Sequence, residues 1–373
     1  MVTGEYRNTA AIIDKEAIQW NILQERKRLS DNELIYAVVK ANAYGHGAVE
    51  VAKTALHSGV DGFCVALLDE GIELREAGIT KPILVLGLID PNYINIAAEY
   101  QLTVTVGRID WIQKAETKLR ESENAESVCV HMALDTGMGR IGFRTEKEVR
   151  ECERELHNST FLKLEGVFTH FATADSEDDS LFLKQQKRFN ELIKSFDKEP
   201  KIVHTANSAT TLFHPKNSSK LIRFGIAMYG LNPSGNLMDP PYPLKPALNL
   251  ISELVHVKKV NQGDYISYGA TYQAQNDEWI GTVPIGYADG WSRDLQGQEV
   301  LVEGVRCEIV GRICMDQFMI RLPKELSVGT KVVLIGKSNG KEITVQETAD
   351  KLNTIHYEVL CGISQRVKRI YLS

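Results

Sequence analysis

Residues 34–47 read LIYAVVKANAYGHG, and this stretch decides how the chain is organised. Residues 34–39 are a continuous apolar, β-branched run of strand length, while residues 49–56 place apolar side chains at the spacing of a helix face. Lys40 therefore lies at the C-terminal edge of a buried strand, before a glycine-rich turn and a helix. Partial loss of water there favours the neutral amine, which is a nucleophile toward carbonyl groups. A lysine that caps the strand and points to solvent fits the same pattern.

Further strands and helices alternate along the chain after this stretch. We expect seven more strands at residues 62–66, 83–87, 103–106, 128–134, 164–169, 202–204 and 221–224. Helical periodicity is found between them at residues 69–77, 111–119, 147–156 and 181–196. Eight strands alternating with helices predict a (β/α)8 barrel of the TIM type, in which catalytic groups gather beyond the C-terminal strand ends.

Side chains with useful chemistry follow the predicted strand ends. They are Lys40 after the first strand, Asp135 and Arg140 after the fifth, His170 after the sixth, Asn207 and Ser208 after the seventh, and Arg223 and Gly225 at the eighth. Because these strand ends share one face of a barrel, we expect the residues to gather there. Ser208 and the backbone N–H groups of Gly225 and Ile226 are candidates for a phosphate site after the last two strands.

A change in composition marks the end of the predicted barrel. Residues 232–246 contain five prolines beside Gly235 and Asn236, which is typical of a domain linker. Short strands dominate from there to the C-terminus, with one expected helix near residues 344–352. We therefore expect a barrel domain at residues 1–239 and a mainly β domain at residues 240–373, with residues 1–13 as a candidate to pack with the second.

Composition and charge exclude several classes of function. The 43 lysines and arginines against 49 acidic residues give a net charge of −6, and no dense basic run suggests a nucleic-acid partner. The N-terminus lacks the apolar core of a signal peptide and no run has membrane-spanning length, so we expect a cytoplasmic protein. Six scattered cysteines, without CxxC spacing, argue against disulfides or a metal site and are expected to be mostly buried thiols.

Eight motifs, in order along nearly the whole chain, resemble those of the bacterial alanine racemases. They are AVVKANAYGHG at 37–47, LDTGMGRIGF at 134–143, HTANSAT at 204–210, RFGIAMYG at 223–230, SYGATY at 267–272, IGYADG at 285–290, GRICMDQ at 311–317 and HYEVLCGISQR at 356–366. Such a set is far more specific than any one motif alone.

The resemblance implies an enzyme that binds pyridoxal phosphate (PLP) covalently on Lys40. It also implies a head-to-tail homodimer, in which the β domain of one subunit completes the active site of the other. Racemisation needs a base on each face of a flat carbanion, and the resemblance assigns these roles to Lys40 and to Tyr268 of the partner subunit. From the residues alone, Tyr268 also fits a core tyrosine in a strand.

The remaining site residues follow from the resemblance as well. It implies that Arg223 donates to the PLP pyridine nitrogen and that Arg140 donates to the PLP phenolic oxygen and the substrate carboxylate. The other implied residues are Tyr44, Ser208, Gly225, Ile226 and Tyr357 at the phosphate, His170 and Asn207 beside the cofactor, and Tyr287, Cys314, Met315 and Asp316 at the substrate.

Purely structural interpretations of some of these residues remain open. Arg223 also fits an ion pair with a surface carboxylate, and His170 a hydrogen-bonded histidine at the barrel mouth. Cys314 is interpreted as a buried, structural thiol because nothing near it in the sequence signals a low pKa.

One position departs from the family pattern. Many relatives have a lysine, often carbamylated, seven residues before the motif arginine, where this chain has Ala133. We expect an anion such as chloride, or a neighbouring carboxamide, to support Arg140 in its place.

Interconversion of L- and D-alanine, which supplies D-alanine for peptidoglycan, is the leading expectation. The alternatives are a broad-specificity amino-acid racemase, a PLP-dependent decarboxylase on the same barrel, and a non-catalytic PLP-binding protein. A second base such as Tyr268 favours proton return over decarboxylation, and a non-catalytic binder typically consists of the barrel alone.

Overall fold

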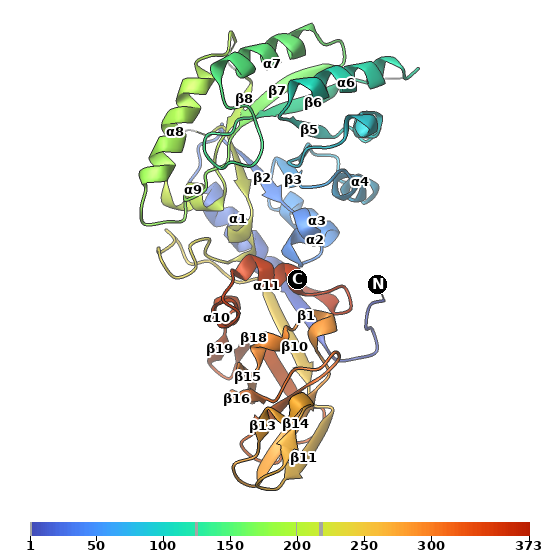
Figure 1. Ribbon diagram of the computed structural model, residues 1–373, viewed down its shortest axis with the longest axis vertical. Helices are drawn as coiled ribbons and strands as arrows, with labels where there is room; N and C mark the ends of the chain where they lie inside the picture. The colour runs from blue at the N-terminus through green and yellow to red at the C-terminus, as the bar shows by residue number, and fades with distance from the viewer. Residues whose placement is uncertain (1, 124–125, 199, 216–218) are drawn as a thin grey trace. The chain divides into compact units, whose positions relative to one another are not determined.

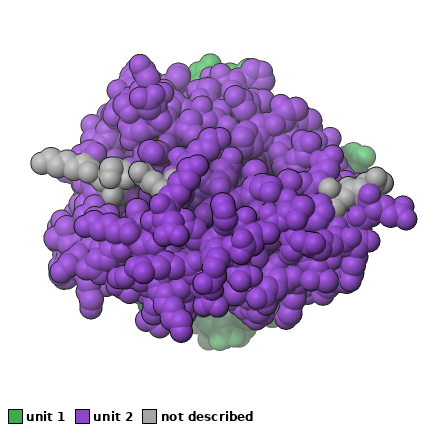
Figure 2. Space-filling view, turned by 90° about the horizontal axis from the view of Figure 1, so that it is seen from above, with its two compact units in different colours: residues 1–17, 44–47, 246–373 green, residues 18–43, 48–245 purple. Residues whose placement is uncertain are grey.

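The chain forms two compact units, which are coloured separately in Figure 2. The barrel unit comprises residues 18–43 and 48–245, and the C-terminal unit comprises residues 1–17, 44–47 and 246–373. The ranges that the computed structural model describes are 2–123, 126–198, 200–215 and 219–373.

Eight parallel strands form the barrel unit, as the sequence predicts (Figure 1). They are β2 (Leu34–Val38), β3 (Gly62–Val65), β4 (Ile83–Val85), β5 (Thr103–Val106), β6 (Val128–Ala133), β7 (Leu162–Phe168), β8 (Ile202–His204) and β9 (Leu221–Phe224). The ladder runs from β8 through β7 down to β2 and then to β9. Backbone hydrogen bonds of 3.0 Å, from Lys220 N to Val203 O and from Arg223 N to Ala206 O, join the two end strands. The barrel is therefore nearly closed.

Helices cover the outside of this barrel (Figure 1). They are α1 (Lys15–Arg26), α3 (Ala48–His57), α4 (Leu68–Glu76), α5 (Ile94–Glu99), α6 (Ile109–Arg120), α7 (Glu146–Asn158), α8 (Ser180–Ile193) and α9 (Ser208–Phe213), with the 3₁₀ turns η1 (Pro91–Tyr93) and η2 (Ile226–Tyr229). Every residue of β3, β5 and β9 is buried, which explains why these strands are mainly apolar. None of the helices in the described ranges is long and apolar enough to cross a membrane.

The C-terminal unit is mainly β, also as predicted. Its strands are β1 (Ala10–Asp14), β10 (Leu248–Glu253), β11 (His256–Val260), β12 (Tyr265–Ile266), β13 (Tyr272–Gln273), β14 (Glu278–Val283), β15 (Glu299–Val302), β16 (Val305–Val310), β17 (Phe318–Leu322), β18 (Lys331–Ser338), β19 (Lys341–Ile343) and β20 (Lys368–Leu372). Its helices are α10 (Val345–Lys351) and α11 (His356–Gly362), and its 3₁₀ turns are η3 (Tyr268–Ala270), η4 (Tyr287–Asp289) and η5 (Arg293–Leu295).

The N-terminal strand β1 is an inner strand of this second unit. It pairs antiparallel with β10 and parallel with β20, so that Ala10 lies opposite both Ile251 and Lys368. The first residues of the chain are therefore built into the sheet formed by strands near its C-terminal end.

The proline-rich segment expected to be a linker is fixed against α1. The buried amide of Asn21 donates to Lys245 O at 2.9 Å and accepts from Lys245 N at 2.9 Å. The Tyr242 hydroxyl donates to Glu25 at 2.8 Å. This segment lacks regular secondary structure, but its backbone is held at several points.

Candidate active site

Lys40 follows β2 and begins a turn with a left-handed backbone conformation. Residues 41–44 all have φ between 51° and 54°, which makes α2 (Lys40–Tyr44) a left-handed turn without glycine. Side chains hold it in place, since Asn42 Oδ1 accepts from Ala48 N at 2.8 Å and Glu70 Oε1 accepts from Ala41 N at 2.6 Å. The glycine-rich turn expected after the strand begins only at Gly45.

Three basic side chains from different strand ends lie around His170. Lys40 follows β2, Arg140 lies in the loop between β6 and α7, and Arg223 lies on β9. Burial, and then the positive charges of Arg223, Arg140 and Lys40, lower the pKa of His170 to about 3. His170 is therefore neutral at physiological pH. The three cationic residues, which we call the basic cluster, suit an anionic ligand.

Arg223 is buried among neutral groups. Nη1 donates to His204 Nδ1 at 2.8 Å, and Nη2 donates to Thr169 O at 2.8 Å and lies 3.5 Å from His170 Nδ1. Burial lowers the pKa of Arg223 to about 10, so the guanidinium stays charged at neutral pH. No carboxylate pairs with it in the part of the chain that the structure describes, so the interpretation of Arg223 as half of a surface ion pair is wrong. A buried charge without a counter-charge is expensive unless a ligand compensates it.

The loop that carries Arg140 is fixed by its own backbone geometry. Asp135 Oδ1 accepts from Gly137 N at 3.1 Å and from Gly139 N at 2.9 Å. Gly142 has a φ of 117°, and a Cβ atom there would lie 2.7 Å from Ala133 O. Glycine is therefore required at Gly142, while the group expected to support Arg140 beside Ala133 stays a prediction.

Ser208 lies where the phosphate site is expected. Its Oγ accepts from Gly225 N at 2.9 Å and from Ala227 N at 3.4 Å, so that its hydroxyl hydrogen can still be donated. Asn207 is the N-cap of α9, because its Oδ1 accepts from Thr210 N at 2.9 Å. Asn207 therefore orients Ser208 and has a structural role of its own.

The predicted substrate residues of the C-terminal unit lie on neighbouring loops. Tyr287 N donates to Cys314 O at 3.1 Å, and Ser267 Oγ lies 3.5 Å from Cys314 Sγ, which brings η3 and η4 to the same loop. Tyr268 is 69% exposed, so its interpretation as a core tyrosine is wrong. Met315 is 52% exposed, and the neighbouring Asp316 accepts from Arg366 at 2.8 Å.

Two further corrections concern cysteines and the end of the chain. Cys314 is half-buried rather than buried, and only three of the six cysteines (Cys64, Cys152 and Cys307) are fully buried. Tyr357, for which no element was predicted, lies on α11, and its ring centroid is 6.0 Å from that of Tyr44. Both tyrosines belong to the C-terminal unit.

The sequence interpretation missed three polar residues inside the barrel. His204 is fully buried and accepts from Arg223, His131 is fully buried and contacts His204, and Glu165 reaches His131. Each is a polar side chain within a mainly apolar strand, which is the only local signal for them.

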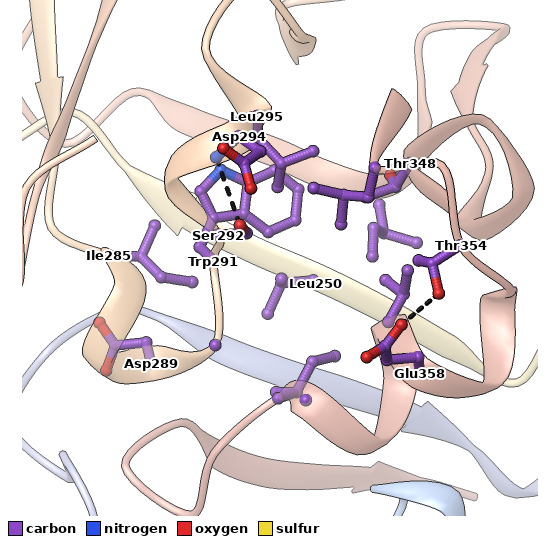
Figure 3. A pocket seen from close by; sticks show the side chains of 16 residues that line it. Leu250, Ile285, Asp289, Trp291, Ser292, Asp294, Leu295, Thr348, Thr354 and Glu358 are labelled. Atoms are coloured by element: carbon purple, nitrogen blue, oxygen red, sulfur yellow. Dashed lines mark hydrogen bonds between the residues drawn. The ribbon is translucent and has the colours of Figure 1, made fainter. Parts of the chain in front are cut away.

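The C-terminal unit also contains a cavity of about 270 Å3, shown in Figure 3. Leu250, Ile285 and Leu295 form part of its wall, and Asp294 and Glu358 are acidic residues in its lining. None of the predicted substrate residues belongs to the set that lines it. The described residues also include no group of three or more His, Cys, Asp or Glu side chains arranged to hold a metal ion.

A nearly closed parallel barrel with a basic cluster at its strand ends, followed by a β unit, defines the class of two-domain barrel proteins with a site suited to an anionic ligand. Comparison with known families identifies which one. Residues 13–233 match the alanine racemase N-terminal domain, and residues 247–371 match the alanine racemase C-terminal domain. The chain belongs to the alanine racemase family and is an isomerase that acts on amino acids.

Similar proteins support this assignment over the full length. An alanine racemase of Ligilactobacillus salivarius is 54% identical over 372 residues, with 100% of each chain covered. The crystal structure of alanine racemase from E. faecalis has a TM-score of 0.97 at 53% identity, again covering 100% of both chains. A histidine racemase from Leuconostoc mesenteroides has a TM-score of 0.94 at 33% identity, with full coverage of both. Family membership therefore supports racemisation of alanine, and the same fold also occurs, at 33% identity, in a racemase of another amino acid.

Proposed function

We propose that the protein interconverts L- and D-alanine with PLP bound on Lys40, and that it supplies D-alanine for peptidoglycan in the cytoplasm. The acting bases are Lys40 and Tyr268 of the partner subunit, in a head-to-tail homodimer. The observation that carries the proposal is the basic cluster, in which a buried Arg223 lacks an anionic partner among the described residues.

The chemistry of the donor set fits PLP and an amino acid. PLP brings a phosphate and a phenolic oxygen, and the substrate brings a carboxylate, so the ligands supply the negative charge that the basic cluster needs. Ser208 offers a hydroxyl to the phosphate beside the backbone of Gly225 and Ile226, while Tyr44 and Tyr357 add hydroxyl groups. Lys40 provides the amine that holds the cofactor aldehyde. When bound, PLP stabilises the negative charge left on the substrate Cα as its proton departs.

Proton transfer is the task of this chain's own residues. Lys40 removes or returns the Cα proton on one face of the substrate, and Tyr268 of the partner subunit does so on the other. Arg140 binds the substrate carboxylate, with the backbone N–H of Met315 of the partner subunit as a second donor, and fixes the Cα–H bond between the two bases. His170 lies 3.5 Å from Arg223 Nη2 and is neutral, so it orients neighbouring groups and does not act as a charged acid.

Arg223 sets the electronic character of the cofactor. A guanidinium keeps its proton, so a hydrogen bond from Arg223 leaves the pyridine nitrogen unprotonated. Without that proton the bound cofactor would withdraw less negative charge from the substrate Cα, so that Cα would take up a proton more readily. Arg223 thereby favours return of a proton to Cα over transamination.

Tyr357, and Tyr287 of the partner subunit, narrow the pocket entrance in this proposal, which favours the methyl side chain of alanine. The alternatives are a broad-specificity racemase and a non-catalytic PLP-binding protein. The similarity to a histidine racemase makes substrate range a specific question for this chain. Comparable turnover of serine, lysine or histidine would replace alanine by a broad substrate class.

The test compares Tyr268→Phe with Tyr265→Phe, because Tyr265 is similarly exposed, at 62%, and lies three residues away. We expect Tyr268→Phe to lose at least about a hundredfold in alanine racemisation, the scale of a lost general base. It should keep the visible absorbance of lysine-bound PLP, while Tyr265→Phe keeps both. Unchanged racemisation by Tyr268→Phe would reject the two-base assignment, and a wild-type protein that gains no PLP absorbance would reject the proposal as a whole.

A further inference from the structure

A chain of hydrogen bonds runs from Arg223 through two histidines to a carboxylate. Arg223 Nη1 lies 2.8 Å from His204 Nδ1, and His204 Nε2 lies 2.8 Å from His131 Nδ1. His131 Nε2 then lies 3.4 Å from Glu165 Oε2. The four residues lie on β9, β8, β6 and β7, so the chain crosses the interior of the barrel unit.

Only one arrangement of protons satisfies every contact in this chain. Arginine can only donate, so His204 Nδ1 accepts and the hydrogen of His204 is on Nε2. His131 Nδ1 must accept that hydrogen, which places the hydrogen of His131 on Nε2, where it is donated to the Glu165 carboxylate. Burial lowers the pKa of both imidazoles, so both are neutral and each has one N–H to place. The carboxylate at one end and the guanidinium at the other therefore both favour the same tautomer of each histidine.

The backbone is shaped to bring Glu165 into this chain. The register between β6 and β7 shifts at this point, with Val130 opposite Leu164 but His131 opposite Gly166, so Glu165 is an extra residue in a β-bulge. Bulges re-aim a side chain and are common beside active sites. The bulge gives Glu165 a position that a regular strand would not.

Gly166 makes room for the imidazole of His131. A Cβ atom at Gly166 would lie 2.7 to 2.8 Å from the His131 ring atoms Cε1, Nδ1 and Nε2. Two backbone features, the bulge and this glycine, thus serve one buried polar contact. An apolar barrel interior would require neither of them, and it would avoid the risk of leaving buried polar groups unpaired.

We propose that His131 and Glu165 are positioning residues for Arg223, which act by holding His204 as the neutral Nε2–H tautomer. His204 in that form presents a lone pair to the guanidinium and keeps it oriented. Through His131 it also connects the positive charge of Arg223 to the negative charge of Glu165. Glu165 itself has its pKa lowered, chiefly by the hydrogen bond from His131, so it is a carboxylate at neutral pH. This inference rests on the proposed function, in which Arg223 donates to the PLP pyridine nitrogen.

The test uses full-length PLP-loaded protein with 15N-labelled histidine, and compares Glu165→Leu with Glu165→Gln. Ring 15N resonances report the tautomer of each histidine without any turnover. In the wild type we expect both His131 and His204 as neutral Nε2–H forms. Glu165→Gln keeps an acceptor oxygen and should keep these resonances, whereas Glu165→Leu should lose the His131 Nε2–H signal and shift those of His204.

The second readout is the ratio of pyruvate released to alanine racemised, which measures how well Arg223 suppresses transamination. We expect Glu165→Leu to raise this ratio about threefold to tenfold and Glu165→Gln to leave it within twofold. If Glu165→Leu does not fold, His131→Phe keeps a ring against Gly166 and should give the same rise.

The outcomes separate the two proposals. A wild-type protein in which His131 or His204 is charged, or has its hydrogen on Nδ1, overturns the chain whatever the variants do. A folded Glu165→Leu or His131→Phe with a wild-type ratio also overturns it. Absence of alanine racemisation in the wild type would instead reject the proposed function.

Discussion

Asp289 joins three distant segments of the C-terminal unit, and Asp289→Asn should loosen all of them. The side chain is 1% exposed. Its carboxylate accepts from Arg7 at 3.0 and 2.5 Å and from Gly286 N at 3.0 Å, and it lies 3.4 Å from Arg366 Nε. Arg7 belongs to the N-terminal segment, Arg366 to the segment before β20, and Asp289 itself ends η4, which begins at Tyr287.

The size of the effect follows from the exposure of the two arginines. Breaking a fully buried ion pair costs about 3 to 5 kcal/mol, whereas a fully exposed pair contributes at most about 1 kcal/mol. The Arg7 and Arg366 side chains are 20% and 30% exposed, so water solvates part of their charge once the carboxylate is gone. We therefore expect Asp289→Asn to lower the free energy of unfolding of this unit by about 2 kcal/mol.

Urea denaturation followed by tryptophan fluorescence measures this change. Replacing Trp20 and Trp111 by Phe leaves Trp279 and Trp291 as reporters, both within the C-terminal unit. With a urea m-value of about 1 to 2 kcal/mol/M for a unit of this size, the midpoint should fall by about 1 to 2 M.

The matched control is Asp294→Asn on η5, where the aspartate is exposed. It removes the same charge five residues away and should leave the midpoint unchanged. A midpoint for Asp289→Asn within about 0.3 M of the control would refute the argument, because the expected fall is about 1 to 2 M.

Two further changes test other parts of the molecule. Gly142→Ala should lower alanine turnover at least about tenfold by displacing the Arg140 loop, because its Cβ would lie 2.7 Å from Ala133 O. The control is Gly139→Ala, which also has a positive φ, of 72°, but has nothing within 4 Å of its Cβ; equal activity of the two variants would contradict the reasoning. Burial lowers the pKa of His356 to about 4, so the unfolded state binds a proton more readily below pH 6.5, and the free energy of unfolding should fall as the pH drops from about 6.5 to 4. His356→Gln should reduce that fall in urea titrations and the exposed His256→Asn should not.

Barrel strands could be predicted from the sequence because they are buried on both faces of the sheet. A parallel strand covered on both faces is apolar along most of its length, so β3, β5 and β9 stand out without an alignment, although β5 includes two threonines and β9 includes Arg223. The candidate residues after those strands followed from the same rule, since each lies at the end of an apolar run or directly after one. Arg223 and Ser208 are both predicted in this way.

Residues whose partners are distant in sequence could not be found by this rule. His131 contacts a histidine 73 residues away and a glutamate 34 residues away, and nothing local marks such a contact. The seven-residue helix α11 is too short for a periodic pattern to emerge, so its boundaries were missed. The exposure of Tyr268 was missed for a related reason, because β12 and β13 are only two residues long and leave η3 outside a regular sheet.

The turn after Lys40 explains why the motif at residues 37–47 combines non-glycine residues of left-handed conformation with glycines. Holding residues 41–44 in the left-handed region costs on the order of 1 kcal/mol for each residue, so the surrounding contacts must compensate several kcal/mol. Glycine is needed only where the backbone then runs close to other groups: a Cβ at Gly45 would lie 2.3 Å from Leu360 O, and one at Gly47 would lie 1.8 Å from Tyr371 Oη. The strained turn therefore ends in direct contact with α11, the helix that carries Tyr357. Within five residues the chain passes from a candidate base at the end of β2 to the support of a candidate phosphate ligand, and this short path is what requires the strain.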